Sequence, residues 1–201
     1  AIGFGLYLLV VGADFCFGKG RAGKASDLQA FGADMGFGVT IAELVEGAQG
    51  HVSSTRIRKA LSDGTPRAAA DMLGHWHRIE GMVIGGEQRG RELGYPTANM
   101  SIEGLHPPKF GVYAVLVEVQ DGPHVGRYHG VASMGVRPMF GENQANLETF
   151  IFDFTDDLYG STLSVALVDY LRPEEKFDGL DALITQMDAD SQRARDILAA
   201  L

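Results

Sequence analysis

Hydrophobic and polar positions follow one pattern before about residue 75 and a different pattern after it. In the first part, short apolar runs alternate with segments whose apolar residues recur at helical spacing. An order of strand, helix, strand and helix is typical of an α/β layer. The predicted elements are strands at Leu6–Val11 and Val39–Val45, and helices at Asp27–Met35, from residue 54 to Leu61, and from Pro66 to Gly74.

Leu6–Val11 is a continuous apolar run bounded by glycines, so we expect a strand that is buried on both faces. Ser26, Ser53 or Ser54, and Thr65 stand ahead of the three helices and are expected to cap them. Two strands cannot complete a doubly wound sheet, so this part is expected to be the tail of such a domain. The chain also starts in what resembles the approach to a buried strand, and we therefore expect a fragment.

From Arg78 onward the pattern is that of short strands. Apolar residues alternate along Gly111–Val119, which ends in an Asp-Gly turn, and three further runs follow at regular spacing. Such a series predicts a small antiparallel barrel. After Arg172-Pro173 the spacing becomes helical, with an acidic break at Asp188–Asp190 that predicts two helices. The three further strands are expected at His129–Val136, Leu147–Phe154 and Leu163–Leu171.

Composition removes some classes of function. The net charge is -9 and the pI about 5.0, whereas a nucleic-acid partner would favour a basic surface. The apolar opening has no basic flank and is too short to cross a bilayer, so no membrane partner is expected. The single Cys16 excludes an internal disulfide and fits a reducing cytoplasm. His75 and His77 have no partner cluster nearby, which argues against a metal site there.

The segment from Gly81 to Asn99, GMVIGGEQRGRELGYPTAN, carries the most informative chemistry. Glycines spaced in this way let backbone N–H groups approach an anion. Pro96 fixes its own φ and so directs Thr97 and Asn99, whose neutral oxygens suit a magnesium ion beside substrate phosphates. The glycine spacing alone is more typical of a glycine-rich hairpin with a proline turn.

Glu148 is the most suggestive single residue, because in LETFIFDF it is expected on the same strand face as Phe150, Phe152 and Phe154. A carboxylate on an aromatic face lies either in water at a barrel mouth or in a buried site with a raised pKa. It is therefore either a solvated strand end or a general base for a substrate hydroxyl.

The whole Gly81–Asn99 string resembles the nucleotide-binding motif of riboflavin kinases, especially the kinase half of bacterial bifunctional riboflavin kinase/FAD synthetases. LETFIFDF with DLYG resembles their second motif, in which this Glu is the catalytic base. The resemblance implies ATP and riboflavin as substrates, FMN as product and Mg²⁺ as cofactor, with Glu148 deprotonating the riboflavin 5′-hydroxyl. It assigns Gly86, Arg91, Thr97, Asn99, Ile151, Asp153 and Tyr159 to ATP, Thr97 and Asn99 also to the metal, and Arg172, Glu175 and Phe177 to the flavin.

The first part resembles the later motifs of the family's adenylyltransferase half, through VGADFCFG and SSTRIR. There, Ser53, Ser54, Thr55, Arg56 and Arg58 would meet a triphosphate at a helix start, although the same string also suits a well-capped basic helix. The family's His-x-Gly-His signature is absent from the chain, so FMN adenylylation is expected to be absent or impaired. In the kinase half, Ser133 and Met139 replace a usual Asn and Thr.

Together these features predict an α+β protein with an incomplete, Rossmann-like nucleotidyltransferase part at residues 1–74. Residues 75–201 are predicted to form a small antiparallel Greek-key β-barrel with C-terminal helices, and to act as a cytoplasmic riboflavin kinase. The alternatives are FMN adenylylation in the intact protein and a non-catalytic flavin or nucleotide-binding module, with an RNA-binding barrel a distant third. The sequence leaves the oligomeric state open.

Overall fold

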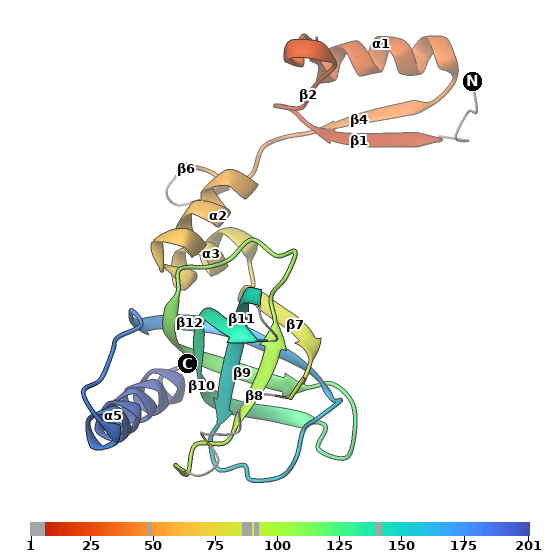
Figure 1. The fold of residues 1–201 in the computed structure, drawn as a ribbon. Helices are drawn as coiled ribbons and strands as arrows, with labels where there is room; N and C mark the ends of the chain where they lie inside the picture. Colours follow the sequence, from red (N-terminus) through yellow and green to blue (C-terminus); the bar gives the residue numbers. More distant parts are fainter. Residues whose placement is uncertain (1–6, 48–49, 86–89, 91–92, 140–141) are drawn as a thin grey trace. The chain divides into compact units, whose positions relative to one another are not determined.

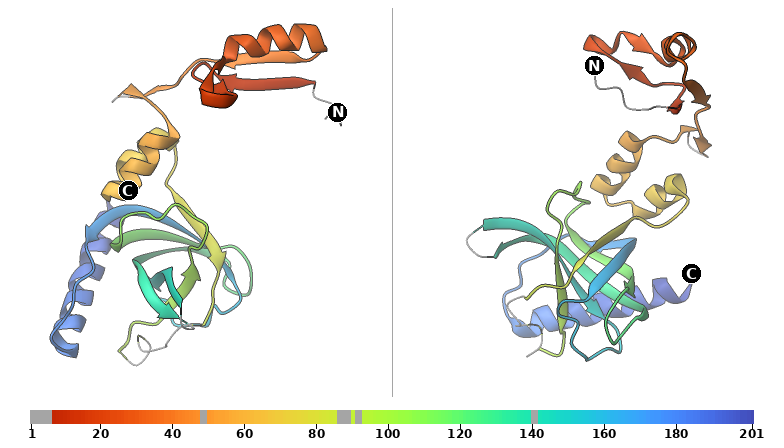
Figure 2. Two further views of the ribbon diagram at one scale, coloured as in Figure 1. Left: turned by 45° about the horizontal axis from the view of Figure 1, so that its top comes forward. Right: turned by 90° about the vertical axis from the view of Figure 1, so that its right-hand side faces the viewer.

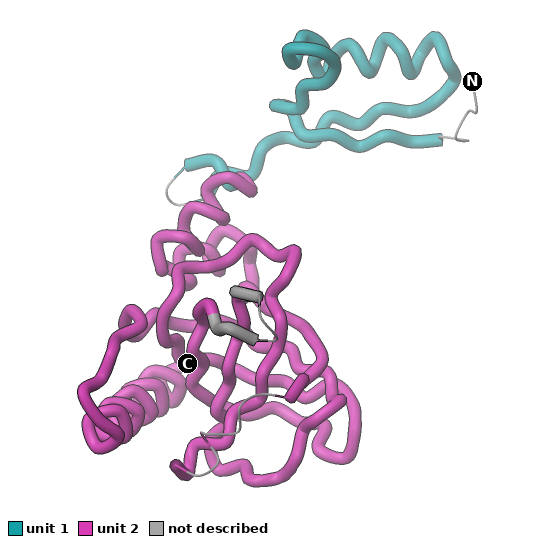
Figure 3. Tube along the Cα trace, in the orientation of Figure 1, with its two compact units in different colours: residues 1–52 teal, residues 53–201 magenta. Residues whose placement is uncertain are grey.

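The structure is a computed structural model and describes residues 7–47, 50–85, 90, 93–139 and 142–201. The chain divides into two compact units, Ala1–Val52 and Ser53–Leu201 (Figure 3). The first unit holds a parallel pair of strands, β1 (Leu8–Gly12) and β4 (Gly38–Ala42), with helix α1 (Ala25–Met35) packed against β4 (Figure 1). Its shorter elements are β2 (Cys16–Phe17), η1 (Lys19–Arg21), β3 (Gly23–Lys24), β5 (Glu46–Gly47) and β6 (Gly50–His51).

Two details of this first unit differ from the predictions. Strand β1 is not buried on both faces, because Leu8 and Val10 are more than half exposed in a sheet of only two strands. Helix α1 begins one residue earlier than the expected cap, Ser26. Its N-cap is Lys24, whose backbone N–H donates a 2.8 Å hydrogen bond to the Asp27 carboxylate. A side chain from the first turn of the helix therefore satisfies the N-cap backbone N–H.

The second unit begins with helices α2 (Ser54–Asp63) and α3 (Pro66–Leu73). Ser53 is the N-cap of α2, and its hydroxyl accepts a hydrogen bond from the Arg56 backbone N–H, as predicted. Helix α2 contacts the loop before β9 (Gly111–Val119), and α3 contacts β12 (Thr162–Arg172). Leu61 accepts a backbone hydrogen bond from Lys109, and Arg67 pairs with Asp169 at 2.9 Å. The compact units therefore divide after Val52, whereas the expected domain boundary near residue 75 stays a prediction.

Six antiparallel strands form a nearly closed barrel, in the order β7-β12-β9-β10-β11-β8 (Figures 1 and 2). Strand β12 returns to lie beside β9, which gives the Greek-key order β12-β9-β10-β11. A single bridge between Ile84 and Asn99 joins the two edge strands, β7 and β8. The strands are β7 (Arg78–Met82), β8 (Thr97–Ser101), β9 (Gly111–Val119), β10 (Gly126–Met139), β11 (Glu142–Ile151) and β12 (Thr162–Arg172).

The barrel interior is filled by side chains from all six strands, as expected for a small barrel. Tyr113, Met100 and Leu147 are among those with no exposed surface. A second apolar cluster lies outside the barrel, where helix α5 (Leu180–Ala199) covers Val112 and Val168 with Ala194 and Leu198. Figure 2 shows this helix lying along one side of the barrel in both views.

The predicted break in the C-terminal helices is wrong, because α5 runs through Asp188–Asp190 without interruption. Asp190 is only 6% exposed and is accommodated within the helix by its partners. The Arg172 guanidinium donates to it from the end of β12 at 2.8 Å, and Gln186 donates from one turn earlier in α5 at 2.9 Å. A buried carboxylate with two such partners does not require the helix to open. In the part of the chain that the structure describes, no helix is long and apolar enough to cross a membrane.

Candidate active site

The site is organised by the pairing of β8 with β11. In this antiparallel ladder Glu148 lies directly opposite Asn99, and Phe150 lies opposite Thr97. Directly opposed residues of an antiparallel pair project from the same face. The two expected metal ligands and the expected base therefore share one face of two adjacent strands. Glu148 is half-buried there.

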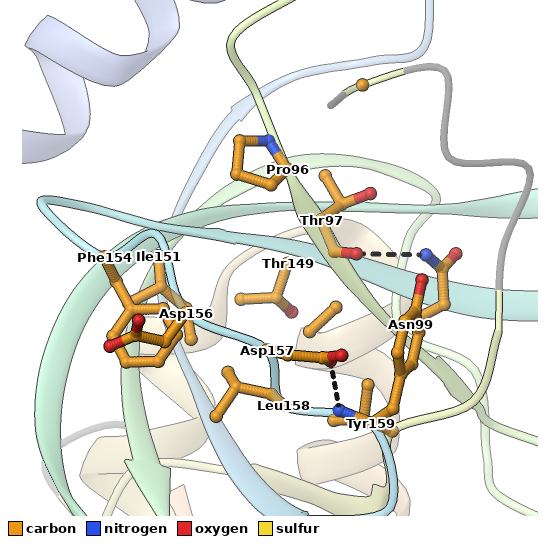
Figure 4. Close-up of a pocket in the computed structure, with 13 residues that line it drawn as sticks. Pro96, Thr97, Asn99, Thr149, Ile151, Phe154, Asp156, Asp157, Leu158 and Tyr159 are labelled. Carbon is orange, nitrogen blue, oxygen red and sulfur yellow. Dashed lines mark hydrogen bonds between the residues drawn. The ribbon is translucent and has the colours of Figure 1, made fainter. Parts of the chain in front are cut away.

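A pocket opens beside this ladder, with a volume of about 630 Å³ that includes its open mouth. Its walls come from the end of β7, from the turn into β8, from β8 and β11, and from the loop after β11 (Figure 4). Four of the predicted nucleotide-side residues lie on it: Thr97, Asn99, Ile151 and Tyr159. The other lining residues are Val83, Gly90, Pro96, Ala98, Thr149, Phe154, Asp156, Asp157 and Leu158.

The turn ahead of β8 is held by backbone contacts that require glycine. Tyr95 donates a backbone hydrogen bond of 2.8 Å to the Gly90 carbonyl, and a side chain at Gly90 would collide with the Tyr95 carbonyl oxygen. Gly94 has a positive φ of 81°, which side chains rarely adopt. Pro96 and Thr97 thus enter the strand from a defined turn at the rim of the pocket.

The donor atoms here fit a magnesium ion. The Asn99 carboxamide is 6% exposed, donates to the Thr97 carbonyl at 3.4 Å and accepts from Asn146 at 3.3 Å. Its oxygen keeps a second lone pair, and the Thr97 hydroxyl adds another neutral oxygen. Among the described residues no group of three His, Cys, Asp or Glu could form a metal cage. Two neutral oxygens suit Mg²⁺ that is bound together with substrate phosphates and water.

The far wall of the pocket was not anticipated from the sequence. Asp157 accepts a 2.9 Å hydrogen bond from the Tyr159 backbone N–H, which tightens the loop after β11. Asp156 faces His124 from the β9–β10 loop at 3.6 Å. The ring of Phe154 lies edge-on to His124 and Tyr128, with centroids 5.4 and 5.3 Å apart. Asp156-Asp157-Leu158 has the composition of an ordinary loop, and nothing in the sequence indicates that its two carboxylates border a cavity.

Asp153 differs from the other predicted nucleotide-side residues because it is not among those that line the pocket. Strand β11 ends at Ile151, and Asp153 follows in a turn with φ 58°. Its carboxylate accepts two 2.9 Å hydrogen bonds from Arg195 of α5, and this partner lowers the pKa of Asp153. Because the strand ends there, Phe154 does not continue the face of Glu148 and instead lines the pocket. Gly86 and Arg91 lie outside the described residues.

Of the three flavin-side residues, Arg172 ends β12, and Glu175 and Phe177 lie in the segment between β12 and α5. Arg172 is held by Asp190, donates to the Pro173 carbonyl at 3.0 Å and lies 5.5 Å from the ring centre of Phe177. Phe177 is half-buried, and Glu175 is exposed. A neighbouring carboxylate that the sequence analysis did not single out, Glu174, occupies the space above Gly135 of β10. Arg172 is thus already oriented by protein contacts.

Ser133 and Met139, the two departures, both lie on β10. Ser133 lies directly opposite Glu148 and therefore on the same face. Met139 lies opposite Glu142, at the end of the hairpin. Only Ser133 is therefore a direct neighbour of the expected base.

Tyr95 connects the turn before β8 to α5. Its hydroxyl donates a short hydrogen bond to Asp188, and its ring packs 4.8 Å from the ring of Phe150. Burial, reinforced by the adjacent Asp188, raises the pKa of Tyr95 to about 12. The nucleotide-side turn and the helix near the flavin-side residues are therefore joined by one neutral phenol.

The expected adenylyltransferase residues surround the start of α2. Ser53 caps the helix, Ser54 and Thr55 are exposed in its first turn, Arg56 is half-buried and Arg58 is exposed. This arrangement is that of a capped basic helix, and it leaves the triphosphate role as a prediction.

A nearly closed antiparallel barrel whose pocket gathers a few polar groups defines a protein of the class that binds small molecules. Residues 73–198 match the riboflavin kinase family, and residues 2–56 match the FAD synthetase family. The chain therefore belongs to the riboflavin kinase family. This confirms the resemblance drawn from the Gly81–Asn99 and LETFIFDF motifs, and it supports riboflavin kinase activity.

Individual relatives agree with this assignment. A bifunctional riboflavin kinase/FMN adenylyltransferase from Listeria monocytogenes is 38% identical over 96% of this chain, and one from Pseudomonas fluorescens is 41% identical over 98%. A crystal structure from Streptococcus pneumoniae, described as a macrolide-efflux protein, matches 94% of the chain with a TM-score of 0.77 and 39% identity. The chain spans about 60% of the length of these relatives.

Proposed function

We propose that this chain transfers the γ-phosphate of ATP to the 5′-hydroxyl of riboflavin, giving FMN and ADP. The observation that carries the proposal is the register of β8 and β11, which sets Glu148 opposite Asn99. Asn99 lines the pocket, whereas Glu148 is not among the lining residues. Phosphoryl transfer requires mainly positioning and charge stabilisation, and little covalent chemistry from the protein. One carboxylate and a phosphate site on adjacent strands meet that requirement.

In this proposal each wall of the site has a separate task. Thr97 and Asn99 hold Mg²⁺, which when bound neutralises charge on the phosphates. Ile151 and Tyr159 line the nucleotide pocket, and Gly86 and Arg91 are assigned to the phosphates from the family motif. Glu148 accepts the proton of the riboflavin hydroxyl as the new P–O bond forms. Arg172, Glu175 and Phe177 contact the flavin, with Arg172 oriented by Asp190.

The first test is an incubation with riboflavin and Mg-ATP, followed by chromatographic separation of the flavins with fluorescence detection. The proposal expects FMN to appear, and expects omission of Mg²⁺ to prevent it. Folded protein that binds riboflavin or ADP without forming FMN would instead support a non-catalytic binding module. Because the reaction uses ATP, we propose the cytoplasm as its place.

The N-terminal part is proposed to belong to a Rossmann-like nucleotidyltransferase domain. The parallel β1–β4 pair with α1 against it, and the match of residues 2–56 to FAD synthetase, support this. Because the 201 residues contain no His-x-Gly-His string, no FAD is expected from this chain. Incubation with FMN and Mg-ATP tests the point, and FAD formation would restore the second activity to this chain.

A further inference from the structure

The pocket contains a buried hydroxyl that the described protein does not use. Thr149 has no exposed surface, and within the described residues its Oγ1 has no hydrogen-bond partner. A buried hydroxyl without a partner is unfavourable, so such groups usually have a bound partner in the working protein. Thr149 is also one of the residues that line the pocket.

The neighbours of Thr149 explain why its hydroxyl is left without a partner. Strand β11 lies between β8 and β10, and the residues directly opposite Thr149 are Ala98 and Ala132. Neither alanine has a polar side-chain atom, and both side chains are short. The two alanines therefore offer the hydroxyl nothing to bond. Figure 4 shows Thr149 on the pocket wall, with its oxygen directed into the space surrounded by Thr97, Asp157 and Ile151.

The Thr149 hydroxyl requires an acceptor, and none of the described protein atoms accepts a hydrogen bond from it. Three of the lining residues carry side-chain hydroxyls, Thr97, Thr149 and Tyr159, and of these only Thr149 is fully buried. Thr149 lines the same pocket as Thr97 and Asn99, the two proposed metal ligands. The hydroxyl is therefore at the end of the pocket where phosphate is expected.

We propose that Thr149 is a nucleotide-binding residue, whose hydroxyl donates a hydrogen bond to a phosphate oxygen of bound ATP or ADP. The inference rests on the proposed kinase function, because it takes the pocket as the nucleotide site. The hydroxyl binds and orients the phosphate, and it takes no part in proton transfer. Its loss therefore weakens nucleotide binding more than it slows the chemical step.

The test compares Thr149→Val, which replaces the hydroxyl by a methyl group of similar size, with Thr149→Ser, which keeps it. The KM for ATP is expected to rise about tenfold in the valine variant, as for the loss of one hydrogen bond to a charged group, with kcat changed less than threefold. The Kd for ADP, measured by calorimetry, is expected to rise by a similar factor. The serine variant is expected to bind ADP nearly as well as the wild type.

Thermal unfolding distinguishes nucleotide binding from a purely structural role. If Thr149 served only the fold, Thr149→Val would lower the unfolding temperature. Without ligand, Thr149→Val is expected to unfold at the same temperature as the wild type or higher, because an unpaired buried hydroxyl is removed. The matched control is Thr162→Val on β12, whose hydroxyl donates to Asp121 at 2.7 Å. That variant is expected to lose stability and to keep the wild-type affinity for ADP.

Several results would overturn the inference. Unchanged KM and Kd in Thr149→Val, or a loss of stability without ligand, would mean that the hydroxyl serves the fold and not the nucleotide. Failure of the wild type to bind ADP at all would also overturn it. Failure to form FMN while ADP still binds would count against the kinase proposal alone, because calorimetry requires no turnover.

Discussion

The two faces of the β8–β11 ladder differ sharply, although alternating residues of the same two strands supply them. One face carries Thr97, Asn99, Glu148 and Phe150, which are polar or half-buried. The other carries Ala98, Met100, Leu147, Thr149 and Ile151, all of them buried. Because strand side chains alternate, a reactive carboxylate can sit one residue from the core without being buried in it. Substitutions on the two faces should therefore separate into effects on activity and effects on stability, with the exception of Thr149, whose hydroxyl we propose to bind the nucleotide.

Glu148→Gln should give the largest effect, and this effect should be on catalytic activity and not on stability. An amide cannot accept the riboflavin proton, so kcat for FMN formation is expected to fall about 10³-fold, within the range of general base catalysis. The affinity for ADP and the free energy of unfolding are expected to stay near the wild-type values. Calorimetry and urea unfolding provide these two controls. A kcat within threefold of wild type would remove Glu148 from the proposed mechanism.

Met100→Ala should give the next largest effect, on stability. Met100 has no exposed surface, so the cavity left by truncation is expected to lower the free energy of unfolding by about 3 kcal/mol. Met82→Ala is the matched control, because Met82 is 59% exposed at the end of the neighbouring strand β7. Its effect is expected to stay within about 0.5 kcal/mol. Equal losses in the two variants would contradict the description of the barrel interior.

Tyr95→Phe should give the smallest effect and test a contact that belongs to neither face alone. Loss of the hydrogen bond to Asp188 is expected to cost about 1 kcal/mol of unfolding free energy at pH 8. The pKa of Tyr95 is raised from 10.0 to about 12, so its contribution is complete below pH 10 and declines as the pH approaches 12. The difference between wild type and variant should therefore shrink from pH 8 to pH 11. Urea unfolding of both proteins at the two pH values measures it, and a constant difference would contradict the proton linkage.

Much of the barrel follows from alternation and turn residues. Strand β9 has the predicted bounds, Gly111–Val119, because its alternation is regular and its ends coincide with glycine and a turn. The proposed metal ligands, Thr97 and Asn99, and the proposed base, Glu148, come from local motifs. Thr149 could not be identified in this way, because its role depends on which residues lie opposite it. The register between two strands cannot be read from the sequence of either strand alone.

The misplaced elements have the same cause. The sequence around Asp188–Asp190 predicts a helix break only while Arg172, eighteen residues earlier, is left out of account. Asp153 was assigned to the nucleotide by the family resemblance and expected within the strand Leu147–Phe154, whereas it lies in a turn and pairs with Arg195 from α5. In both cases a partner distant in the sequence determines what a charged residue does.

The Arg172–Asp190 pair has a consequence for α5 as a whole. Apolar contacts between a helix and a sheet are unspecific, so on their own they allow similar burial after a slide of one turn, about 5.4 Å along the axis. The buried carboxylate removes this freedom, because any slide would leave it in an apolar environment without its guanidinium partner. The ion pair of Asp190 with Arg172 therefore fixes the position of α5 along its axis. Asp188, two residues away in α5, thereby has a fixed location at which it can meet Tyr95.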